Sequence, residues 1–138
     1  MTTIVVDASV MGPFIIPDEV SDLREDVLAG LSTGSVMVPQ HWRLEVANLA
    51  RMAVKRKRLD DGELPSIVSR LDDFFVQVDG ETDRKAWSSI LDLSRQHDLT
   101  TYDAAYLELA LRIGGLLATS DKRLTEAAAT HHALLVAR

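Results

Sequence analysis

The chain has 138 residues, of which 46% are hydrophobic and 26% are charged, and it contains no cysteine. This size and composition are typical of one globular domain, so we expect a single domain over residues 1–138. Without cysteine there is no disulfide framework, thiolate metal site or cysteine nucleophile, which favours a cytoplasmic protein. A formal charge of -6 argues at first sight against a nucleic-acid partner.

Short apolar runs alternate with helical patterns along the chain. We expect strands at 4–6, 36–38, 74–78, 116–119 and 133–136, and helices over 20–31, 41–57, 60–71, 87–94, 103–113 and 121–129. No apolar stretch approaches the roughly 18 residues that span a bilayer, so we expect no membrane association. The alternation predicts an α/β fold with a central parallel sheet of about five short strands and helices on both faces.

Acidic residues follow two of these expected strands. Asp7 closes the first strand, and Asp121 follows the strand at 116–119. Glu45 lies on the helix after the second strand, and Asp103 opens a later helix. Ligands of open parallel sheets bind beyond the carboxyl ends of the strands, where these acids would meet. Carboxylates that are brought together repel one another unless a cation lies between them, and oxygen ligands select a hard ion such as Mg²⁺ or Mn²⁺.

Four short motifs, in order and at similar intervals, resemble those of PIN-domain nucleases, and more narrowly those of the VapC toxins of toxin–antitoxin pairs. They are VVDASV at 5–10, EVAN at 45–48, TYDAAY at 101–106 and ATSDKRL at 118–124. Each motif alone is a weak signal, but the four together are specific. The resemblance covers nearly the whole chain.

This resemblance implies a Mg²⁺- or Mn²⁺-dependent endoribonuclease that hydrolyses RNA phosphodiester bonds, is inhibited by a cognate antitoxin and forms a homodimer. It implies a catalytic and metal-binding quartet, which consists of Asp7, Glu45, Asp103 and Asp121. It also implies supporting side chains that lie near the metal or orient the carboxylates, namely Ser9, Asn48 and Thr119.

Two other functions stay open from the sequence. A receiver-like signalling domain also binds magnesium through acids at strand ends, but it would carry a second acid beside Asp7, where this chain has Val6 and Ala8. A noncatalytic PIN-fold subunit would keep the fold and act only by binding another protein. The intact acids count against that second alternative, although each acid taken singly also fits a turn, a helix cap or a solvated helix.

The net charge averages segments of opposite sign. Residues 43–58 carry six cations and one acid, whereas residues 59–83 carry eight acids and one cation. The segment 51–58 alone holds five cations, which is equally consistent with a contact to RNA or antitoxin and with a solvated helix end. The overall acidity therefore does not exclude an RNA partner.

Overall fold

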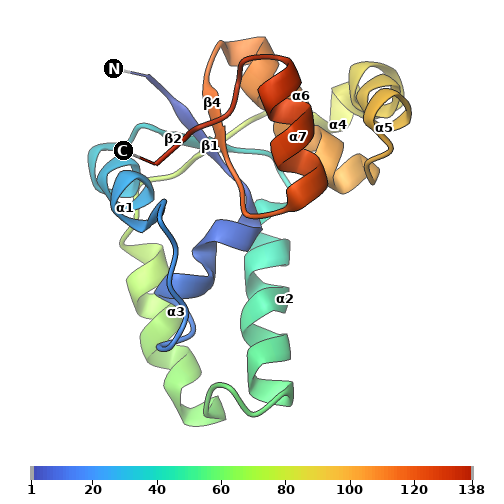
Figure 1. Ribbon diagram of the computed structural model, residues 1–138. Coiled ribbons are helices and arrows are strands. Elements are labelled where there is room, and N and C mark those ends of the chain that lie inside the picture. Colours follow the sequence, from blue (N-terminus) through green and yellow to red (C-terminus); the bar gives the residue numbers. More distant parts are fainter. Residues whose placement is uncertain (1, 138) are drawn as a thin grey trace.

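A computed structural model describes residues 2–137 as a four-stranded sheet packed between helices (Figure 1). The strands are β1 (Ile4–Val6), β2 (Val36–Val38), β3 (Gln77–Val78) and β4 (Leu116–Ala118). They lie in the order β3-β2-β1-β4, and each strand is parallel to its neighbours. The predicted α/β class with a parallel sheet is confirmed.

The sheet is one strand smaller than the sequence predicts. The segment 133–136 does lie parallel to β4, but it pairs only through a single bridge between Leu117 and Leu134. Beyond this bridge, Val136 is exposed, so its apolar side chain does not continue the sheet. The prediction of a fifth strand is therefore wrong. β3 is also shorter than expected, because Phe74 packs edge-on against Phe14 in the core instead of extending the strand.

The helices follow the predicted order with shifted limits. They are α1 (Arg24–Thr33), α2 (Trp42–Lys55), α3 (Leu64–Asp72), α4 (Thr82–Lys85), α5 (Leu91–His97), α6 (Thr101–Ile113) and α7 (Lys122–Thr130). The chain also contains helical segments that are not α-helical, namely the 3-10 segments η1 (Ala8–Phe14) and η2 (Asp61–Glu63) and the π-helical turn η3 (Ala86–Ile90). None of the helices in residues 2–137 has the length and apolar character needed to span a bilayer.

Two of these limits differ from the prediction for local reasons. The first helix begins at Arg24 instead of residue 20, because residues 18–23 form turns in which Asp18 and Glu19 pair with Arg58. The helix expected over 87–94 is the middle of a longer helical segment that runs through α4, η3 and α5. Its π-helical turn widens the helix where the sequence shows only ordinary periodicity.

The strand order of the sheet has a switch point between β1 and β4. From β1 the chain moves outward to β2 and then β3, whereas β4 pairs with the opposite side of β1. Right-handed crossovers in opposite directions place their helices on opposite faces, and α1 and α6 flank the sheet from different sides (Figure 1). Ligands of such sheets bind beyond the strand ends at this switch point, which is where Asp7 leaves β1 and Thr119 leaves β4.

α6 runs through the core of the molecule. Every residue from Ala104 to Ala110 is buried, which is the pattern of a helix enclosed on all sides. The helix is capped by Thr100, whose Oγ1 accepts the backbone N–H of Asp103 at 3.1 Å. Asp103 therefore lies inside the first turn and does not open the helix as the sequence analysis expected.

A cluster of ion pairs anchors the other end of α6. Arg112 donates to Asp79 at 2.6 Å and to Glu108 at 2.8 Å, and the two carboxylate side chains are only 7% and 6% exposed. The hydrogen bond from Arg112 lowers the pKa of Asp79 below its usual value. Because Asp79 directly follows β3, the cluster ties the edge of the sheet to the central helix.

Candidate active site

Asp7 lies at the carboxyl end of β1 and is 4% exposed. Ser9 Oγ and Thr119 Oγ1 both donate to the same oxygen of this carboxylate, Oδ2, at 2.7 Å each. Burial raises the pKa of Asp7 in spite of these hydrogen bonds, and the charge of Glu45 raises it further. Two hydroxyls thus fix the orientation of a buried carboxylate that also experiences the charge of Glu45.

Thr119 also connects Asp7 with Asp121. Its Oγ1 accepts the backbone N–H of Asp121 at 3.0 Å. Asp121 is the N-cap of α7, and its Oδ1 accepts the backbone N–H of Leu124 at 2.8 Å. Asp121 can therefore cap α7 and also belong to the acidic site, since the cap uses only one of its two carboxylate oxygens.

Glu45 lies in the first turn of α2 and is held by two side chains. Its Oε1 accepts the hydroxyl of Tyr106 at 2.5 Å and lies 3.3 Å from His41 Nε2. The same His41 nitrogen lies 3.1 Å from the carbonyl oxygen of Tyr102, and because both partners are acceptors, we assign the proton to Nε2. The hydrogen bond with His41 lowers the pKa of Glu45, against the opposing effect of burial.

Asp103 is affected by all three of the other acids. Burial and then the charges of Asp7, Asp121 and Glu45 raise the pKa of Asp103 to about 6. This is the effect expected when carboxylates gather without a cation between them. The structure therefore brings the four predicted acids together at the carboxyl edge of the sheet.

The donor set of this edge fits a hard divalent cation. The groups that it offers are carboxylate oxygens, and burial together with the neighbouring acids raises the pKa of Asp7 and of Asp103. Within residues 2–137, no three His, Asp or Glu side chains already surround one point as metal ligands would. An ion would therefore have to draw the carboxylates inward, and its charge would offset their repulsion.

We expect the contribution of Asp103 to the stability of the metal-free protein to fall as the pH rises from about 4 to about 6. In this range Asp103 stays protonated in the folded protein and ionises in the unfolded chain, so the folded state binds more protons and the free energy of unfolding falls with pH. Since the side chain is only partly buried, the expected loss is about 1–2 kcal/mol.

Unfolding of the wild type and of Asp103→Asn in EDTA, at several pH values between 4.5 and 7.5, measures this effect. The substitution removes the titrating group, so the stability of the variant relative to the wild type should increase as the pH rises. A difference that stays constant over the whole range would contradict the raised pKa of Asp103.

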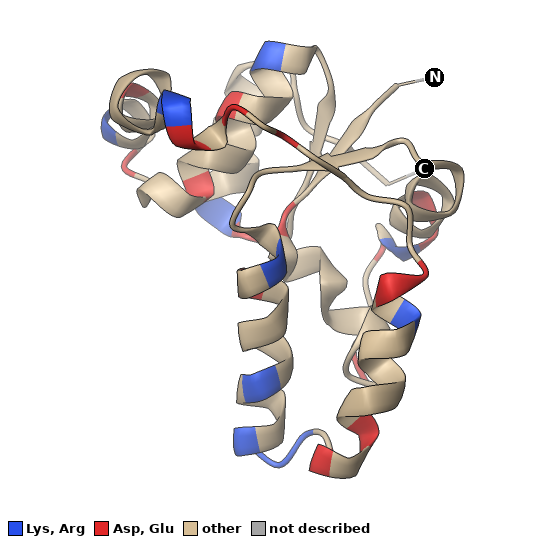
Figure 2. Ribbon diagram, turned by 180° about the vertical axis from the view of Figure 1, so that it is seen from behind, with Lys and Arg blue, Asp and Glu red and all other residues tan. Residues whose placement is uncertain are grey.

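Asn48 and the basic segment 51–58 lie on α2 beyond the acids. Asn48 is exposed and lines a cavity together with Arg56 and Arg58, and no hydrogen bond joins it to the four acids in the part of the chain that the structure describes. Its expected role in orienting a carboxylate stays a prediction. Arg58 pairs with Glu19 at 2.9 Å, so the basic segment is partly neutralised within the protein. Figure 2 shows the remaining basic residues along α2 and at its far end.

His41 and Tyr106 were not among the site residues expected from the sequence. His41 precedes Glu45 by four residues, and Tyr106 follows Asp103 by three, so each shares a helix face with one of the acids. The two rings are also adjacent, with centroids 5.0 Å apart. This helical spacing is the signal by which both residues could have been found.

Comparisons with known proteins agree with this arrangement. The family model of the PIN domain matches residues 4–130. The chain is 30% identical over 123 residues to Ribonuclease VapC3 of Pyrobaculum aerophilum, an alignment that covers 89% of this chain and 92% of the relative. The crystal structure of PAE2754 from Pyrobaculum aerophilum has the same fold, with a TM-score of 0.65 and 21% identity over 91% of this chain and 79% of that one. The chain therefore belongs to the PIN-domain family and is of the VapC type.

Proposed function

We propose that this protein is an endoribonuclease toxin that hydrolyses RNA phosphodiester bonds with Mg²⁺ or Mn²⁺. The observation that carries the proposal is the gathering of four carboxylates, in which burial and then the charges of the other three raise the pKa of Asp103. The ribonuclease name of the relative from Pyrobaculum aerophilum supports the same chemistry. The residues that would hold the ion are Asp7, Glu45, Asp103 and Asp121. The bound ion would supply positive charge for the phosphate oxygens and lower the pKa of a water molecule for attack on phosphorus.

The remaining side chains of the site would orient these ligands. Ser9 and Thr119 fix the carboxylate of Asp7 through its Oδ2. Tyr106 and His41 act in the same way on Oε1 of Glu45. Such partners of metal ligands reduce the number of carboxylate orientations that binding must select.

Removal of divalent ions is expected to abolish RNA cleavage, and Mg²⁺ or Mn²⁺ should restore it. The reason is that the chain has no cysteine and that His41 directs its Nε2 proton at Glu45 and at the carbonyl oxygen of Tyr102, so the attacking water would depend on the ion. A labelled single-stranded RNA incubated with protein in EDTA, and then with each ion in excess, measures the effect. A folded protein that cleaves no RNA with either ion would favour the alternative of a noncatalytic PIN-fold subunit.

A groove between α2 and α3 is the face that we assign to the cognate antitoxin. The groove has a volume of about 390 Å³ and is lined mainly by apolar side chains, among them Val46, Ile67 and Leu71. Trp42 Nε1 lies buried at this groove and has no hydrogen-bond partner within residues 2–137, whereas buried donors are normally paired. Arg43 also lines the groove, which favours a partner segment with apolar and acidic residues. The proposal includes a homodimer and a cytoplasmic location.

A further inference from the structure

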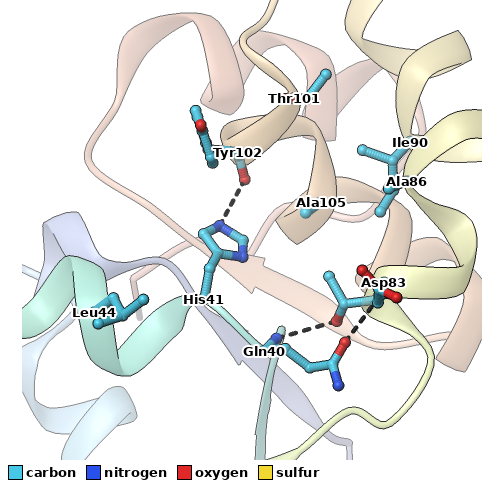
Figure 3. Close-up of a pocket in the computed structure, with 10 residues that line it drawn as sticks. Gln40, His41, Leu44, Asp83, Ala86, Ile90, Thr101, Tyr102 and Ala105 are labelled. Carbon is cyan, nitrogen blue, oxygen red and sulfur yellow. Dashed lines mark hydrogen bonds between the residues drawn. The ribbon is translucent and has the colours of Figure 1, made fainter.

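A second pocket opens directly beside the acids, between the start of α2, the turn η3 and the start of α6 (Figure 3). Its volume is about 320 Å³. The apolar part of its lining comes from Leu44, Ala86, Ile90 and Ala105, and Tyr102, Gln40 and Asp83 add polar groups. None of these residues belongs to the four acids, so the pocket is separate from the proposed metal site.

The walls of this pocket are joined to each other by hydrogen bonds. The backbone N–H of Gln40 donates to Thr82 Oγ1 at 3.1 Å, and Gln40 Oε1 accepts the backbone N–H of Asp83 at 2.8 Å (Figure 3). The turn η3, which supplies Ala86 and Ile90, is π-helical, and such turns occur frequently at functional sites. The pocket is therefore formed before any ligand arrives.

The pocket also shares residues with the environment of the acids. His41 lies on its wall and is 3.3 Å from Glu45 Oε1 and 3.1 Å from the carbonyl oxygen of Tyr102. Tyr102 in turn directly precedes Asp103 in the chain. Only the side chain of His41 thus separates this wall of the pocket from Glu45.

We propose that the pocket binds one unpaired nucleobase of the RNA whose phosphate lies at the four acids, an inference that rests on the proposed function. A nucleobase has two apolar faces, and Tyr102 is 64% exposed, with its ring centroid 5.9 Å from that of His41. An exposed aromatic ring is suited to stacking on a base. The exposed carboxylate of Asp83 only accepts hydrogen bonds, so it would pair with a donor on the base edge, which is an amino group in adenine, cytosine and guanine and the ring N–H in uracil.

Titration with free nucleosides in EDTA tests this subsite without metal, phosphate or hydrolysis. The probes are adenosine, cytidine and uridine, and binding is followed by the amide chemical shifts of Thr101 and Ala105. We expect Tyr102→Ala to weaken adenosine and cytidine binding about tenfold, as loss of one base–aromatic stack would. The carbonyl of residue 102 stays in place, so the hydrogen bond to His41 is kept. Phe75→Ala is the matched control, since Phe75 is also 64% exposed but lies on another surface, and should bind like the wild type.

Two results would overturn the subsite. They are equal nucleoside affinities of Tyr102→Ala and the wild type, and a loss of antitoxin affinity in Tyr102→Ala without a loss of nucleoside affinity. In RNA cleavage, Tyr102→Ala should raise KM about tenfold and change kcat far less. If nucleosides bind as expected and no ion supports cleavage, the proposed nuclease function fails. If ions restore cleavage and Tyr102→Ala changes neither nucleoside affinity nor KM, only the subsite fails.

Discussion

Asp7→Asn is expected to lower RNA cleavage at least about a thousandfold, which corresponds to about 4 kcal/mol of transition-state stabilisation, while the protein keeps its fold. The substitution preserves the size of the side chain and an oxygen that can accept from Ser9 and Thr119. It removes the charge that a metal ion would require. It also removes a buried carboxylate whose pKa is raised by burial, so the free energy of unfolding should stay the same or increase.

Cleavage of a labelled RNA and thermal unfolding of the same samples measure both effects. Asp98→Asn provides the same chemical change at the surface, since the side chain of Asp98 is 92% exposed, and should alter neither quantity. Cleavage by Asp7→Asn within tenfold of the wild type, in protein free of contaminating nuclease, would contradict the proposed metal site. Loss of cooperative unfolding in this variant would show that Asp7 has a structural role instead.

Arg112→Ala is expected to lower the free energy of unfolding by about 3–5 kcal/mol. The substitution leaves the carboxylates of Asp79 and Glu108 buried without the guanidinium that pairs with both of them. The cost comes from these uncompensated charges, and it should therefore shrink in acid as the carboxylates become protonated. Urea unfolding at pH 7 and at pH 4 measures both the loss and its pH dependence.

Arg123→Ala is the matched control for this prediction. Arg123 pairs with Asp98 at a similar distance, 2.9 Å, but the two side chains are 68% and 92% exposed. Exposed pairs of this kind contribute about 0–1 kcal/mol, so the control should be close to the wild type. Similar losses in the two variants would show that burial of the Arg112 cluster has no special effect on stability.

The layered fold follows from short-range patterns, whereas the extent of the sheet does not. The β-branched run Ile4–Val6 and the helical periodicities indicate the type and order of the elements, and the structure agrees with both. The segment 133–136 has the same apolar character as a strand, but only Leu134 pairs with β4. How many residues pair depends on the path that the chain takes beside β4, and local sequence does not encode this path.

The acids of the candidate site stand out in the sequence because two of them follow strands, Asp7 and Asp121, and two lie in the first turns of helices, Glu45 and Asp103. Their partners were harder to find, since Tyr106 reaches Glu45 across 61 positions of sequence. The burial of Asp79 could not be predicted from the sequence for another reason. It lies in a segment with eight acids, which suggests solvation, and only its pairing with Arg112 explains why it is buried.

Thr82 connects the ion-pair cluster around Arg112 with the pocket beside the acids. Its hydroxyl donates to Asp79 at 3.1 Å and accepts the backbone N–H of Gln40, also at 3.1 Å. The wall of the pocket at α4 is thereby supported by the Arg112 cluster, whereas the wall at His41 contacts Glu45. Substitutions at residues 82–90 would therefore change the proposed base subsite from the side that does not touch the acids.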